Sequence, residues 1–153
     1  AKTRLLEDIG MALPWIAAID EFQHWIYTHP EHGHAERDGA WTKIYRKYAS
    51  HEISWHHVEE AFVFAWQKQP HIFEDPFYYI EYAIAQLGAI ELFEQFLKSP
   101  IETVQRFMAA LELGGSVPME EVYARAGVEF SISQDRIARI AHFLETQLSG
   151  LWK

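Results

Sequence analysis

Residues 76–98, PFYYIEYAIAQLGAIELFEQFLK, give the clearest indication of how this chain folds. Apolar residues cover most of the helical circumference as far as Leu92, interrupted only by two glutamates and one glutamine. A helix that is apolar nearly all round belongs at the centre of a helical protein. At about 1.5 Å per residue it would be roughly 34 Å long, enough to cross a domain of this size. We therefore predict a long central helix over residues 76–98. It would begin at Pro76, because the first turn of a helix does not need the N–H that proline lacks.

Apolar residues at helical spacing recur on both sides of this segment. Pro14 interrupts the first run, so either one kinked helix or two abutting helices would satisfy it. Ser54 has the position of an N-cap, since its hydroxyl can accept from an otherwise unpaired N–H. The predicted helices around the central one cover residues 2–27, 34–49, 55–68, 100–113, 118–125 and 133–148. No stretch sustains a two-residue alternation, so we predict an all-α fold in which residues 1–153 form a single helical region.

Charge and composition narrow the classes of partner. The chain has 13 Lys and Arg against 22 Asp and Glu, and its basic residues form no stripe, so we expect no nucleic acid partner. It has no cysteine, which excludes disulfides and thiolate metal ligands and fits a reducing, cytoplasmic location. No apolar run approaches the roughly 20 residues that a membrane span needs, so we expect no membrane partner.

A histidine and three tyrosines stand out at the start of the predicted central helix. His71 lies in a short connection bounded by two prolines, which restrict its position. Tyr82 follows Tyr78 by four residues and Tyr79 by three, so it can share a helix face with either. Aromatic residues at this spacing often only fill a core, where a tyrosine needs one partner for its hydroxyl. Clustered hydroxyls are also the donors that stabilise an oxyanion, which is the functional interpretation.

Two groups of histidines have only a partial likeness to metal sites. His29, His32 and His34 lie in a predicted loop that offers no carboxylate at ligand spacing on a rigid element, which favours a solvated loop. In HEISWH, residues 51–56, the histidines are five positions apart, whereas a zinc-binding HExxH helix needs them at i and i+4. We therefore predict no metal ligand in this chain.

Three segments together resemble the C-terminal part of zinc metallopeptidases of the oligoendopeptidase F family, relatives of thimet oligopeptidase. They are IDEFQHWIYTHP at residues 19–30, WQKQPHIFEDPFYYIEYA at 66–83 and LELGGSVPMEEVYARAGVEF at 111–130. The segments follow the family's order over most of the chain, and the second is the most specific. The resemblance implies an almost wholly helical fold that closes a deep channel over a zinc ion.

The resemblance also implies roles for the histidine and the tyrosines. In the family, the matching residues lie on the channel wall opposite the zinc, where they bind the substrate carbonyl and stabilise the tetrahedral oxyanion. Carried over to this sequence, His71, Tyr79 and Tyr82 are candidate catalytic residues, and Tyr78 is a candidate substrate-binding residue. Ile80 stands where many members have another tyrosine, so the pair of hydroxyls that acts is left open.

The expected activity is limited by what the sequence lacks. The family's zinc ligands and general base lie in an HExxH helix and the helix after it, and no residues here match either one. By the family's order both would come before Ala1, so the resemblance implies a C-terminal fragment of a longer peptidase catalytic domain. The full-length protein is expected to be a zinc metalloendopeptidase that hydrolyses short peptides with a zinc-bound water. This chain alone is expected to bind no zinc at a catalytic site and to be inactive.

Two further expectations concern association. If the chain is a fragment, apolar surface that met the missing part is exposed, which predicts self-association. The alternative function is a stand-alone, non-catalytic helical module, derived from the same fold, that binds peptides or another protein.

Overall fold

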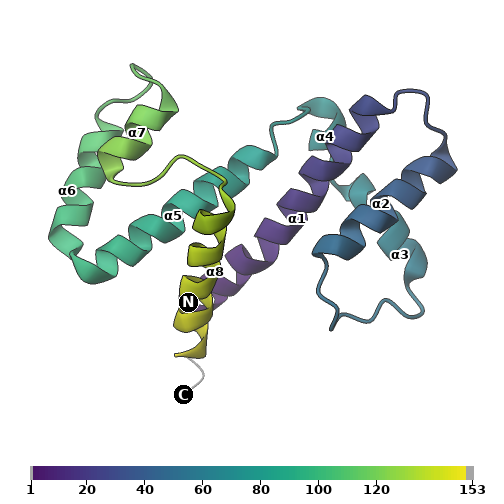
Figure 1. Cartoon of the computed structure of the whole chain (residues 1–153), viewed down its shortest axis with the longest axis horizontal. Coiled ribbons are helices and arrows are strands. Elements are labelled where there is room, and N and C mark those ends of the chain that lie inside the picture. The colour runs from purple at the N-terminus through teal and green to yellow at the C-terminus, as the bar shows by residue number, and fades with distance from the viewer. Residues whose placement is uncertain (1, 151–153) are drawn as a thin grey trace. The chain divides into compact units, whose positions relative to one another are not determined.

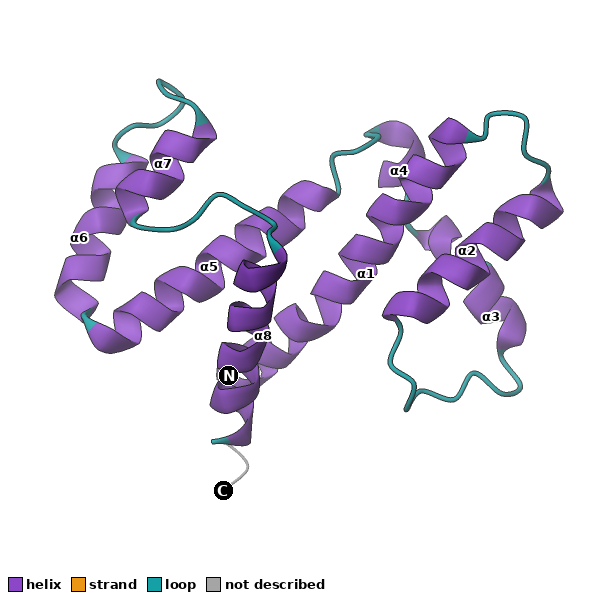
Figure 2. Ribbon diagram, in the orientation of Figure 1, coloured by secondary structure: helices purple, strands orange, loops and turns teal. Residues whose placement is uncertain are grey.

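The computed structural model describes residues 2–150, and these residues form helices and loops without a strand (Figure 2). The all-α prediction is confirmed. The helices, labelled in Figure 1, are α1 (Lys2–Thr28), α2 (His34–Tyr48), α3 (Glu59–Val63), the 3₁₀ helix η1 (Ala65–Lys68), α4 (His71–Glu74), α5 (Ile80–Lys98), α6 (Pro100–Leu111), α7 (Met119–Ala126) and α8 (Gln134–Ser149). No helix in this described part is long and apolar enough to cross a membrane.

The chain divides into two compact units, and the division falls within α1 and within α5. The first unit comprises residues 11–83, and the second comprises residues 84–150 with residues 2–10. We describe each unit by itself. The prediction of a single helical region over residues 1–153 stays a prediction.

Helix α1 is continuous through Pro14, so the first apolar run forms one helix. An interior proline removes a helical hydrogen bond and crowds the preceding turn. The residues that follow offset this cost, because Ala18, Ile19 and Phe22 are completely buried. Burial of such side chains contributes roughly 1.5–3 kcal/mol each for the large ones, comparable to the cost of the proline.

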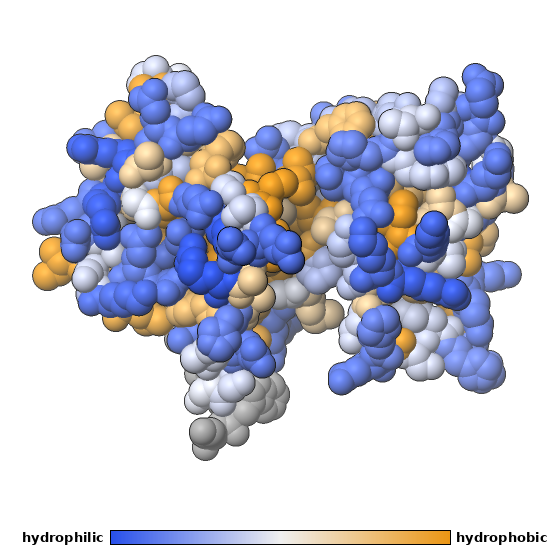
Figure 3. Space-filling view, viewed as in Figure 1, coloured by the Kyte–Doolittle hydropathy of each residue, from blue (hydrophilic) through white to orange (hydrophobic). Residues whose placement is uncertain are grey.

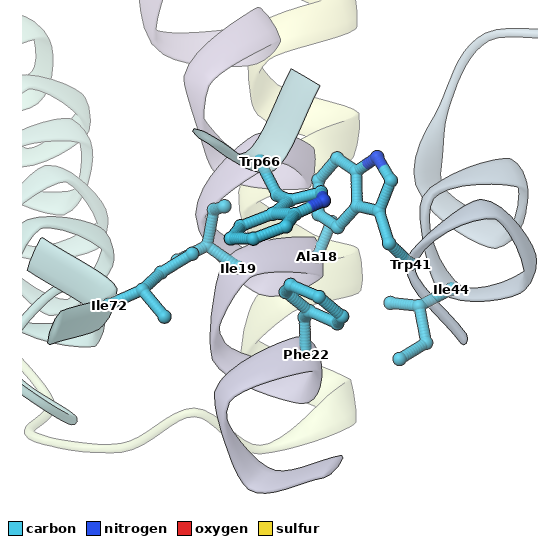
Figure 4. Close-up of a cluster of buried hydrophobic side chains, with 7 residues drawn as sticks. All are labelled: Ala18, Ile19, Phe22, Trp41, Ile44, Trp66 and Ile72. Atoms are coloured by element: carbon cyan, nitrogen blue, oxygen red, sulfur yellow. The ribbon is translucent and has the colours of Figure 1, made fainter. Parts of the chain in front are cut away.

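The core of the first unit is a cluster of aliphatic and aromatic side chains, drawn in Figure 4: Ala18, Ile19, Phe22, Trp41, Ile44, Trp66 and Ile72. Phe22 packs edge-on against Trp41 with ring centroids 5.2 Å apart. The buried Trp41 indole donates from Nε1 to the carbonyl oxygen of Phe62 at 2.8 Å, which ties α2 to α3. The core therefore joins α1, α2, η1 and α4.

The predicted helix over residues 55–68 is wrong. The structure has two short helices there, α3 and η1, and α3 begins only at Glu59. His57 takes a positive φ of 72°, which a right-handed helix does not allow. The Ser54 hydroxyl accepts from the N–H of His56 at 3.4 Å, so it stabilises a local turn instead of capping a long helix.

The prediction that the long helix begins at Pro76 is also wrong, because α5 begins at Ile80. Phe77 lies in the left-handed region with φ of 64°, a conformation that costs a non-glycine residue roughly 1–2 kcal/mol. Its N–H donates to Oε1 of Gln23 on α1 at 2.8 Å, and Gln23 is fully buried. The buried Gln23 side chain thus holds residues 76–79 in a turn, although the proline suggested that they begin the helix.

In the second unit α6 and α7 lie side by side (Figure 1). Their shared core contains Ala110, Ala126 and Val128, with partly buried Leu92, Val122 and Tyr123 packed against it. Helices α7 and α8 lie within one residue of the predicted ranges 118–125 and 133–148. Gly127 ends α7 with φ of 75°, the left-handed conformation that glycine favours, and the Ser133 side chain caps α8 by accepting from the N–H of Arg136.

Helix α8 is attached to α5 by charged side chains. Arg136 donates from Nε and Nη2 to Oε2 of Glu91, at 3.1 and 2.9 Å. Arg139 bridges Oε1 of Glu91 and Oε2 of Glu94, each at 3.0 Å. The Arg136 side chain is fully buried, and Glu91 is 11% exposed. One of the polar residues that interrupt the apolar surface of α5 is therefore buried in an ion pair.

Apolar side chains remain exposed on the second unit where α5 is followed by α6. Orange patches lie over this region at the left of Figure 3, and its exposed residues are Phe96, Leu97, Ile101, Val104 and Phe107. Exposed apolar patches of this kind favour association. Self-association of the chain stays a prediction.

Gly88 on α5 lies directly against the Tyr123 side chain on α7. A Cβ atom at Gly88 would lie 2.9 Å from Cε1 of Tyr123, whose hydroxyl donates to the carbonyl oxygen of Ile84. We expect Gly88→Ala to lower the free energy of unfolding by about 1–2 kcal/mol, because the clash outweighs the helix propensity of alanine. Gly39→Ala in α2 is the matched control, since no atom lies within 4 Å of its Cβ position. Urea unfolding of both variants would contradict the packing argument if Gly88→Ala were as stable as Gly39→Ala.

Candidate functional site

The histidine and the three tyrosines singled out in the sequence lie together in the first unit. The His71 ring lies 5.1 Å from the Tyr79 ring and 5.9 Å from the Tyr82 ring, measured between centroids. Tyr82 lies 5.3 Å from Tyr79 and 5.7 Å from Tyr78. The structure thus brings all four candidate residues into one ring cluster, and their catalytic and binding roles stay predictions.

The four side chains differ in exposure. Tyr78 and Tyr82 are 50% and 43% exposed, whereas His71 and Tyr79 are half-buried. A tyrosine that only filled the core would be mostly covered. Tyr82 is therefore accessible to a ligand while it remains in ring contact with His71.

Helix α1 supports the segment that carries these residues. The Tyr27 hydroxyl donates to the carbonyl oxygen of Ile72 at 3.2 Å. The Phe77 ring packs on His24 and Tyr27, with centroids 5.0 and 5.2 Å apart, and Gln23 accepts from the Phe77 N–H. Because α4 and the turn before α5 are both attached to α1, His71 and the tyrosines are held on a common support.

Two residues of the site were missed from the sequence. Gln69 is 8% exposed, and its Nε2 lies 2.6 Å from Nδ1 of His71. Its Oε1 accepts from the Trp15 indole N–H at 3.3 Å. The signal for Gln69 was its place two residues before His71, across a proline. Trp15 gave no such signal, because it is 54 residues away from Gln69 along the chain.

Burial raises the pKa of the Tyr79 phenol above its ordinary value of 10.0. A hydrogen bond from Trp15 acts in the opposite direction, and the nearby Tyr82 raises the pKa further. Tyr79 is therefore a neutral phenol at physiological pH, with a proton that can be donated in a hydrogen bond.

Alkaline pH is expected to destabilise the first unit, because burial also raises the pKa of Tyr45 and of Tyr48. A pKa raised on folding adds stability that is fully present below the unfolded pKa of about 10 and is lost as pH rises through the folded pKa. Urea unfolding between about pH 9 and pH 12 should show this decline. Tyr79→Phe removes one of these tyrosines, so its free energy of unfolding should decline less steeply with pH than that of the parent protein. An identical decline in the two proteins would contradict a raised pKa for Tyr79.

Comparison with known proteins places the chain in a family. The profile of peptidase family M3 matches residues 2–141. The chain belongs to peptidase family M3. The match confirms the family that the three sequence segments resemble, and no curated protein sequence matched this family M3 chain.

Two solved structures resemble this family M3 chain over 97% of its length. One is described as an oligoendopeptidase F, with 30% sequence identity and a TM-score of 0.83. The other is PZ peptidase A with an inhibitor, with 29% identity and a TM-score of 0.88. The chain covers 26% of each of them, so it spans about a quarter of the structures it matches.

Family M3 implies a catalytic zinc, and we tested whether this chain offers ligands for one. Among residues 2–150 there is no group of three or more His, Cys, Asp or Glu side chains placed to hold a metal ion. In the histidine-rich loop, Nε2 of His32 accepts from Nε of Arg37 at 2.8 Å, and His29 stacks on Trp25. The described residues therefore do not fit a zinc site, and we assign zinc binding to none of them.

Proposed function

We propose that this chain is the C-terminal part of a zinc-dependent oligoendopeptidase that hydrolyses short peptides. Its own contribution would be a wall that binds the substrate carbonyl and stabilises the oxyanion formed from it. The observation that carries this proposal is the ring cluster of His71, Tyr79 and Tyr82, with centroids 5.1–5.9 Å apart and Tyr82 open to solvent.

The chemistry of the cluster suits this role. A neutral imidazole has one N–H donor, and each phenol has one O–H donor. Donors that are already positioned where negative charge develops stabilise the transition state more than the substrate. His71, Tyr79 and Tyr82 would donate to the oxyanion, and Tyr78, the most exposed of the four, would contact the peptide beside it.

The test uses a reconstituted peptidase, which we define as one polypeptide in which this chain follows an HExxH-bearing segment of family M3. We expect the reconstituted peptidase to cleave internally quenched short peptides and to lose this activity with a chelator. The 153-residue chain alone, supplied with equimolar zinc, should cleave none of them. The proposal would be refuted if the purified chain bound stoichiometric zinc and hydrolysed the same peptides.

A further inference from the structure

The orientation of the Gln69 side-chain amide is set by Trp15. An indole Nε1–H can only donate, so the atom that faces it must be an acceptor. The amide oxygen of Gln69 fills this role at 3.3 Å. A flipped amide would direct its NH₂ group at the indole N–H, and two donors facing each other cannot form a hydrogen bond. With Oε1 on Trp15, the amide nitrogen Nε2 faces His71.

The amide orientation in turn determines which nitrogen of His71 carries the proton. Nε2 of Gln69 has two N–H donors and cannot accept a hydrogen bond. It lies 2.6 Å from Nδ1 of His71, so Nδ1 must accept and therefore carries no proton. A neutral imidazole holds its single proton on the other nitrogen. His71 is thus the Nε2–H tautomer, and Nε2 is a hydrogen-bond donor.

We infer that Trp15 and Gln69 are positioning residues that hold His71 as the Nε2–H tautomer, so that its ring offers a donor to the substrate carbonyl. Only the target of this donor rests on the proposed function; the tautomer follows from the contacts alone. Gln69 is 8% exposed, so bulk water has little access to replace either hydrogen bond. The Lys68 ammonium lies over the Trp15 ring, 4.3 Å from the ring centroid.

Nitrogen-15 NMR of the whole chain tests the tautomer directly. The protonated ring nitrogen of a neutral histidine resonates far upfield of the unprotonated one. At a pH where the imidazole is neutral, we expect the His71 proton on Nε2. We also expect a scalar coupling across the hydrogen bond between Nε2 of Gln69 and Nδ1 of His71. A proton on Nδ1 of His71 would overturn the inference, and so would absence of the coupling.

Gln69→Glu is the decisive variant, because it keeps the shape of the side chain and turns the donor into an acceptor. The carboxylate can accept only from an Nδ1–H, so we expect the neutral His71 ring to move its proton from Nε2 to Nδ1. Gln67→Glu is the matched control: it adds the same charge to an exposed side chain two residues away and should leave the His71 tautomer unchanged. An unchanged tautomer in Gln69→Glu would overturn the inference.

Trp15→Phe provides a second variant that does not alter the charge. It keeps an aromatic ring against Trp41 and Tyr45 but removes the indole N–H that orients Gln69. The amide can then take either orientation, so we expect His71 signals averaged between the two tautomers. Retention of a single Nε2–H tautomer would show that Trp15 does not position Gln69.

Measuring the activity of the reconstituted peptidase distinguishes failure of this inference from failure of the proposed function. In the reconstituted peptidase, Gln69→Glu should remove the proton from Nε2 of His71, so that this nitrogen can no longer donate to the oxyanion. We therefore expect kcat to fall by about 100-fold with little change in KM, as for loss of one oxyanion donor. If the tautomer switches and kcat does not fall, the tautomer inference stands and the oxyanion role of His71 is wrong. If kcat falls without a switch, the positioning inference is wrong and the oxyanion role remains.

Discussion

His71→Phe is expected to lower kcat of the reconstituted peptidase by about 100-fold or more, with KM nearly unchanged. Phenylalanine keeps an aromatic ring against Tyr79 and Tyr82, whose centroids lie 5.1 and 5.9 Å from the His71 ring. It removes both ring nitrogens and therefore the donor. An oxyanion exists only in the transition state and the intermediate. Loss of the donor that stabilises it therefore lowers kcat more than it weakens substrate binding.

The control for this prediction is His142→Phe, since the His142 side chain on α8 is 83% exposed. We expect this control to retain the activity of the parent protein. Tyr82→Phe should lower kcat in the same direction as His71→Phe, because only the hydroxyl is lost. A rise in KM at constant kcat for His71→Phe would assign the histidine to ground-state binding. Unchanged kcat and KM would remove His71 from the site.

Glu91→Leu is expected to lower the free energy of unfolding by about 3–5 kcal/mol, the largest stability effect that we predict. The variant leaves the guanidinium of Arg136 fully buried without its carboxylate partner. Arg139 keeps its bridge to Glu94 at 3.0 Å, so the cost falls on Arg136. Urea unfolding followed by circular dichroism measures the change as a shift in midpoint.

The double variant Glu91→Leu/Arg136→Met should recover most of this loss. Replacing both partners of a buried pair by apolar side chains is often neutral or stabilising, whereas removing one strands a charge. Glu102→Leu is the control, because its partner Arg106 is 3.7 Å away and both side chains are well exposed. That control should change stability by no more than about 0.5 kcal/mol. Equal losses for Glu91→Leu and Glu102→Leu would contradict the role given to burial.

Local signals in the sequence were reliable where a helix end depends on neighbouring residues. The predicted ends of α7 and α8 lie within one residue of the observed ones, where Gly127 is a left-handed stop and Ser133 is an N-cap. Both features use hydrogen bonds or backbone freedom within one turn, so a single chain segment contains all the information. The start of α5 was mispredicted because its decisive contact comes from Gln23, 54 residues before Phe77.

The candidate site likewise combines features that depend on neighbouring residues with features that depend on contacts distant in sequence. The all-α class, the resemblance to family M3 and the choice of His71 and the tyrosines as candidates could all be predicted from the amino-acid sequence, because they depend on residue type and short spacing. The contacts by which Trp15 orients Gln69, and Gln69 in turn contacts His71, became visible only in the folded chain. The hydrogen bond that orients the Gln69 amide comes from Trp15, 54 positions earlier in the chain, and no local pattern predicts it. Whether a histidine offers a donor or an acceptor is settled by its buried neighbours, which folding alone brings into contact.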